Sequence, residues 1–191
     1  MTGSRGYSVL ELVVVLAVMT VLAAIVVPKI GAFKANNDTH DLSSALSVAK
    51  LRGASNFTQA RLFVDLAGGT HRVEWWQKTG VPGWVAASGL TPLSSGDGFA
   101  FGMVGTPPPD TQAAISQAPA CLDNAGNPIG ATACVVFNSR GVPIDATGAP
   151  TNNDALYVTD GKSVGAVTVS AAGLISVWTT PMSAAPTWAH K

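Results

Sequence analysis

The feature that most constrains this chain is an apolar run near its N-terminus. The first residues, 1–6, are short, polar and basic at Arg5, and residues 12–27 are apolar apart from Thr20. Glu11 stands directly before this run. About 20 apolar residues can cross a bilayer as a helix, and a carboxylate inside such a segment costs about 2.5–3.5 kcal/mol on insertion scales. The sequence therefore predicts a membrane-spanning helix with one carboxylate that has a function.

Two ordinary interpretations each leave a feature of this N-terminal segment unexplained. A secretory signal peptide ends in a small-residue cleavage site, whereas the apolar run ends in Val26-Val27-Pro28-Lys29. A simple signal anchor on a periplasmic protein leaves Glu11 unexplained. If Glu11 lies at the membrane edge the insertion cost shrinks, so the signal anchor stays open as an alternative.

The residues around Glu11 carry a more specific pattern. Gly6-Tyr7-Ser8-Val9-Leu10-Glu11 resembles the cleavage motif of type IV prepilins, although the family usually has Phe or Met where this chain has Tyr7. The resemblance implies that a prepilin peptidase cuts between Gly6 and Tyr7 on the cytoplasmic side and methylates the new amine. Pro28 then stands where many pilins have a helix-kinking proline.

The same resemblance implies a role for Glu11, which becomes the fifth residue of the mature chain. In a filament the apolar helices bundle away from water, and a buried carboxylate needs a partner. The implied partner is the N-terminal amine of a neighbouring subunit. The alternative is that Glu11 is a tolerated glutamate at an interface.

The spacing of the apolar residues divides the rest of the chain into a helical part and a β-rich part. Apolar or small residues recur every three to four positions up to Phe57 and indicate an amphipathic second half of the helix. We expect a leader over 1–6, a transmembrane and assembly helix over 7–57, a β-rich head over 58–180 and an irregular tail over 181–191. Within the head, period-two patterns and turn residues predict strands at Arg61–Leu66, Arg72–Gln77, Trp84–Ala87, Phe99–Val104, Cys134–Asn138, Ala155–Thr159, Val164–Ser170 and Leu174–Trp178.

The two cysteines, Cys121 and Cys134, would close a short loop. In a chain with an export-type N-terminus this spacing predicts one disulfide, formed outside the cytoplasm and worth roughly 3 kcal/mol. Two free buried thiols are the alternative.

The head is similar to the family formed by H-type minor pseudopilins of type II secretion and FimT-type minor pilins. Three stretches carry this similarity: residues 41–52, residues 136–143, and residues 156–170 with Gly173. The resemblance implies an α+β, pilin-like fold in which a long N-terminal hydrophobic α-helix packs on a small antiparallel β-sheet head. Some FimT-type proteins bind DNA near a closing Gly-Arg, but here Gly173 is followed by Leu174-Ile175-Ser176, which disfavours a DNA receptor.

Charge and histidine placement give little support to catalysis or nucleic-acid binding. Eleven basic and eleven acidic side chains cancel, so no basic stripe is expected. The histidines His40, His71 and His190 lack metal-ligand spacing. A pairing of His71 with Glu74 is poor, because residues at odd spacing on a strand face opposite sides. We predict no catalytic residue, no metal and no cofactor.

Two other groups have ordinary explanations. Asp154 and Asp160, with Asn152 and Asn153, suggest calcium but lack the EF-hand spacing, so we interpret them as polar loop residues. Core packing explains the tryptophans best, as a cluster in the head, and an exposed patch for a partner is the alternative; they are Trp75, Trp76, Trp84 and Trp178.

Together these patterns predict a non-enzymatic structural subunit, a minor pilin or pseudopilin at or near the tip of a type IV pilus or type II secretion pseudopilus. The expected location is the inner membrane, with a single span, the N-terminus cytoplasmic and the head periplasmic, followed by the filament. The expected partners are other pilin subunits, the prepilin peptidase, an inner-membrane assembly platform and, before assembly, membrane lipid. A DNA-binding minor pilin remains the alternative.

Overall fold

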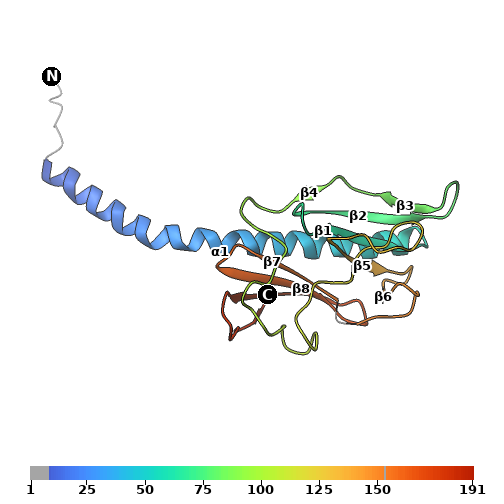
Figure 1. The fold of residues 1–191 in the computed structure, drawn as a ribbon. Helices are drawn as coiled ribbons and strands as arrows, with labels where there is room; N and C mark the ends of the chain where they lie inside the picture. Colours follow the sequence, from blue (N-terminus) through green and yellow to red (C-terminus); the bar gives the residue numbers. More distant parts are fainter. Residues whose placement is uncertain (1–8, 153) are drawn as a thin grey trace, which may run out of the picture.

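The fold is one long helix followed by two antiparallel sheets (Figure 1). The structure is a computed structural model that describes residues 9–152 and 154–191, with the backbone alone for residues 23–34. The helix, α1, spans Val9–Ser55. Its first part projects beyond the sheets, and its second part lies alongside both of them (Figure 1).

The two sheets follow each other along the chain. The first sheet has the order β3-β2-β1-β5-β6, with β4 also paired to β2. Its strands are β1 (Ala60–Asp65), β2 (Thr70–Gln77), β3 (Gly83–Ala86), β4 (Thr91–Pro92), β5 (Thr132–Phe137) and β6 (Pro143–Ile144). The second sheet has the order β10-β9-β8-β7. Its strands are β7 (Asp154–Thr159), β8 (Ser163–Val169), β9 (Ile175–Pro181) and β10 (Ala189–His190).

The core forms where the second part of α1 meets the sheets. Leu42, Leu46 and Ala49 recur at helical spacing and are fully buried. They share one apolar cluster with alternate residues of β1, β5, β7 and β8: Leu62, Val64, Ala133, Val135, Phe137, Leu156, Val158, Val167 and Val169. Burying each leucine of this kind contributes about 1.5–3 kcal/mol.

Polar contacts fix the second part of α1 in place. The buried Asp38 carboxylate accepts hydrogen bonds from the N–H and hydroxyl of Ser94, at 3.0 and 2.8 Å. The Lys50 ammonium donates to the Gly173 carbonyl at 2.8 Å and so connects α1 with the turn between β8 and β9. The helix is therefore attached to both the loop after β4 and the second sheet.

The expected fold class, a long hydrophobic helix packed on one small sheet, is wrong. The described side chains that pack on the sheets belong to the amphipathic part, Ala35–Ser55, whereas the apolar residues of Val9–Leu22 are exposed. The head also has a six-stranded and a four-stranded sheet instead of one small sheet. The cause is that the sheets bury a helical stripe, and a segment that is apolar on every side offers no such stripe.

The predicted membrane span and single-pass inner-membrane location are corrected as well. Among the described residues, no helix combines the length and the apolar character needed to cross a membrane.

Several predicted strands are found and two expectations fail. The hairpin around Gly68-Gly69 is confirmed as β1 and β2. Residues 99–104 form no strand, and Gly98 alone makes a bridge, to Thr159. The tail is not wholly irregular, because β10 pairs with β9 and Lys191 donates its N–H to the Val177 carbonyl at 3.0 Å.

Candidate functional site

The predicted assembly residues lie on the projecting part of the chain. Gly6 and Tyr7 lie outside the described residues. Glu11 is in the first turn of α1 and exposed. Pro28 lies within α1, where the backbone alone is described. The predicted roles of these four residues therefore stay predictions.

The neighbourhood of Glu11 is an exposed apolar surface. Every large apolar side chain from Val9 to Leu22 is more than half exposed, with Val9 at 82% and Leu22 at 53%. Contiguous apolar surface of this kind marks an interaction site in proteins. We call Val9–Leu22 the apolar segment.

A second candidate site lies on the face of the first sheet that points away from α1. Leu62 and Val64 of β1 point into the core, so Arg61 and Phe63 point to the opposite face. Arg61 lies opposite Glu74 of β2 in the strand register. Their side chains form a buried ion pair with an Arg61 Nε to Glu74 Oε2 distance of 2.7 Å.

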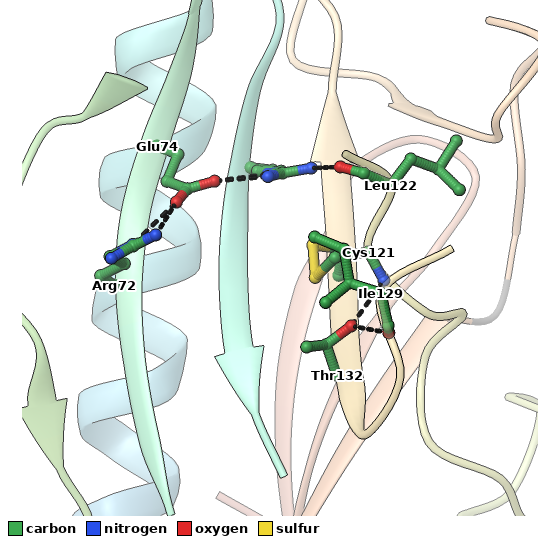
Figure 2. Close-up of a disulfide and its surroundings, with 8 residues drawn as sticks. Arg72, Glu74, Cys121, Leu122, Ile129 and Thr132 are labelled. Atoms are coloured by element: carbon green, nitrogen blue, oxygen red, sulfur yellow. Dashed lines mark hydrogen bonds and ion pairs between the residues drawn. A yellow bond between two sulfur atoms is a disulfide. The ribbon is translucent and has the colours of Figure 1, made fainter. Parts of the chain in front are cut away.

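Glu74 is the centre of a network of three charged side chains (Figure 2). Its second oxygen accepts from Arg72 Nε at 2.7 Å, and Arg61 also donates to the Leu122 carbonyl at 2.7 Å. Desolvation lowers the pKa of Arg61, while the Glu74 carboxylate raises it. The Glu74 carboxylate thus contacts two arginines, and the Leu122 carbonyl accepts a further hydrogen bond from Arg61. These contacts satisfy a buried ion pair that would otherwise be costly.

The disulfide holds a loop over this face. Cys121 and Cys134 are bonded, with an S–S length of 2.00 Å and a Cα–Cα distance of 4.9 Å, as predicted (Figure 2). The Thr132 hydroxyl accepts from the Cys121 N–H at 3.0 Å and donates to the Ile129 carbonyl at 2.6 Å. Together with the bond from Arg61 to Leu122, these contacts fix the loop over residues 119–130 above the sheet.

Between this loop and the sheet lies a cavity of about 530 Å³, which we call the outer groove. One end has two tryptophans, Trp76 and Trp84, with ring centroids 5.4 Å apart in an edge-to-face arrangement. The Arg61 guanidinium lies 4.0 Å from the centroid of Trp84. The groove continues past Val136 of β5 and Ile144 of β6. Its walls combine apolar side chains of the sheet with residues of the loop over 119–130.

Acidic side chains also line the outer groove. Asp154, the first residue of β7, lines it and is 8% exposed. Burial raises the pKa of Asp154 to about 6. Among the described residues no hydrogen bond or ion pair reaches its carboxylate. Asp123 and Asp145 also line the groove, and both are exposed loop residues.

Other residues singled out in the sequence are not brought together. His71 is buried and near Asp41 and Asp38 of α1, while Glu74 is on the opposite face of the sheet. Desolvation lowers the pKa of His71, and the two aspartates oppose this shift. No group of three or more potential metal ligands forms among residues 9–152 and 154–191.

The predicted tryptophan cluster and the polar loop are corrected in part. Trp178 packs against His190 in the second sheet, at a centroid distance of 4.7 Å, apart from Trp76 and Trp84. Asp160 accepts from the N–H groups of Lys162 and Ser163 and so shapes the turn between β7 and β8, but Asp154 is a buried strand residue.

Comparison of the chain with protein-family models, with curated proteins and with solved structures finds no match.

Proposed function

We propose that this chain is a structural subunit of a filament, a minor pilin or pseudopilin, and that the apolar segment is its assembly surface. The observation that carries the proposal is the exposure of Val9–Leu22 on a helix that projects beyond the sheets. Such a surface is stable in water only when other apolar surface covers it. Equivalent helices of neighbouring subunits are the partners that this proposal gives it.

Glu11 supports the same proposal. A carboxylate among exposed apolar side chains becomes buried when helices bundle around it, and it then needs a cationic partner. The motif from Gly6 to Glu11 resembles that of type IV prepilins, in which this partner is the N-terminal amine of the next subunit. Glu11 would therefore set the axial register of one subunit against the next.

The test replaces Glu11 with glutamine, which keeps the size of the side chain and removes its charge. Because an uncharged amide cannot form the ion pair, we expect E11Q to be processed normally at Gly6 and to be at least fivefold depleted from sheared filaments. The measurements are the mass of the N-terminal peptide and quantitative immunoblots of the sheared and cellular fractions.

The matched control is Asp41→Asn, which removes an exposed carboxylate from the packed part of the same helix. D41N should assemble like the wild-type protein. Incorporation of E11Q at the wild-type level would contradict the role of Glu11 in assembly. An unprocessed N-terminus in the wild-type protein, with the peptidase present, would contradict the prepilin assignment itself.

An in-frame deletion strain separates the two kinds of filament. Loss of protein secretion with intact surface pili would assign the chain to a secretion pseudopilus. Loss of pili with intact secretion would assign it to a type IV pilus.

A further inference from the structure

Among the residues that the structure describes, Asp154 is a buried acid without a partner, and it lines a cavity. The residue is 8% exposed, and a carboxylate in such a place is normally hydrogen-bonded or paired, because burying the ionised form alone is costly. Asp154 has no such contact among the described residues, and it belongs to the lining of the outer groove. Its carboxylate therefore has free acceptor capacity toward the groove.

Two further carboxylates, Asp123 and Asp145, line the outer groove with Asp154. A hydrogen bond from the Asn127 N–H lowers the pKa of Asp123, and one from the Thr147 hydroxyl lowers the pKa of Asp145, so both stay ionised at neutral pH. Arg61, the cation in the lining, is already engaged by Glu74 and Leu122. The free charge in the groove is thus negative.

The shape of the outer groove limits what can occupy it. The groove crosses β2, β1, β5 and β6 between Trp76 and Ile144. At about 4.8 Å between neighbouring strands, this path is roughly 15 Å long, which is the length of about four or five extended residues. Its middle, at β5, is apolar, with Val136 in the lining, and Ile144 extends this apolar lining to the end at β6.

We propose that the outer groove binds an extended segment of a partner protein, and that a lysine or arginine of that segment pairs with Asp154. The apolar residues of the segment lie over Val136 and Ile144, toward Trp76 and Trp84. Charge complementarity selects this occupant, because a cation gives Asp154 the partner that none of the described residues provides. The inference does not depend on the proposed filament role, since it uses no residue of α1.

The test uses two libraries of acetylated, amidated hexapeptides, with lysine fixed at the fourth position in one and glutamine in the other. The remaining positions are mixtures of uncharged residues. The full chain, kept in solution with mild detergent, is immobilised, and retained peptides are counted by mass spectrometry. We expect the lysine library to be retained at least fivefold more than the glutamine library.

Two variants assign the preference to the groove. Asp154→Asn should abolish the preference for lysine while its near-ultraviolet circular dichroism stays that of the wild-type chain. Asp110→Asn removes an exposed carboxylate outside the groove, so the preference should persist. Equal retention of the two libraries by the wild-type chain, no retention of either, or a preference that survives in D154N would overturn the proposal.

Discussion

At the scale of single residues, Glu74 and Asp154 are both buried carboxylates, but they differ in whether a cation compensates their charge. Glu74 has two arginines as partners, so its charge is compensated. Asp154 has none among the described residues, and burial raises its pKa to about 6. The folded chain therefore binds a proton at Asp154 more tightly than the unfolded chain, whose ordinary value is 3.8.

This difference gives the stability a dependence on pH that Asp154→Asn removes. Below about pH 4 Asp154 is protonated in both states, and above about pH 6 the folded state carries a buried charge. As the pH rises through this window, the wild-type chain should lose up to about 3 kcal/mol of unfolding free energy relative to D154N. Urea unfolding of both proteins at pH 4 and pH 8 measures the change.

The change of unfolding free energy between the two pH values is compared between the wild-type chain and D154N. The contributions of other groups that titrate in both proteins therefore cancel. His71, whose pKa is lowered by burial, is one of them. A stability gap between D154N and the wild-type chain that is the same at both pH values would show that Asp154 is not desolvated in the folded state.

At the scale of elements, the contact of α1 with β8 depends on Gly165, which has no side chain. A Cβ at Gly165 would clash with the Thr39 hydroxyl, which itself bonds to the Ala35 carbonyl. Glycine lets the helix and the strand approach more closely than any other residue would. Asn36–Thr39 is continuous helix, and Thr39 is fully buried against β8.

Gly165→Ala should lower the unfolding free energy by about 1–3 kcal/mol, the usual cost of overpacking. Chemical denaturation of the variant measures this loss. The double variant Thr39→Ala with Gly165→Ala should recover part of it, because the clashing hydroxyl is removed. Gly148→Ala is a poor control since its φ is +82°, whereas Gly130→Ala meets no neighbour within 4 Å and should change stability little. Equal losses in G165A and G130A would contradict the close contact.

At the scale of the whole molecule, the sequence predicts local features well and long-range ones poorly. The hairpin of β1 and β2 follows from turn glycines between alternating residues, and the disulfide from two cysteines in a turn-rich stretch. The pairing of β1 with β5 joins segments far apart in the chain, so no local sequence pattern predicts it. Without that pairing, the outer groove cannot be foreseen.

The burial of Asp154 could not be predicted from the sequence for the same reason. In sequence it follows polar residues and looks like part of a loop. Its burial arises because β7 pairs with β8 and its first residue faces β6 and the loop over 119–130, which come together only in the fold. Arg61 and Glu74 were detectable in principle, because opposite charges stand at paired positions of a predicted hairpin.

The disulfide connects the loop over 119–130 to the central part of the first sheet, so its loss should act on a limited region. Cys121→Ser with Cys134→Ser should cost roughly 3 kcal/mol for a loop of this size. Hydrogen exchange should speed up over 119–130, while the amides of β8 and β9 keep their relative order of protection. Uniform acceleration over both sheets would contradict this local role. Reduction of the wild-type chain is the matched comparison.

The contact of α1 with both sheets has a consequence for synthesis on the ribosome. The stripe of Leu42, Leu46 and Ala49 emerges first, yet β8 and β9, which also contact the helix, are translated only near the end of the chain. Until then the part of the stripe that the second sheet covers stays exposed on the nascent polypeptide, and chaperones bind exposed apolar surface of this kind. Chains that stop before β8 would therefore be clients of holdases and proteases, and full-length chains would escape them.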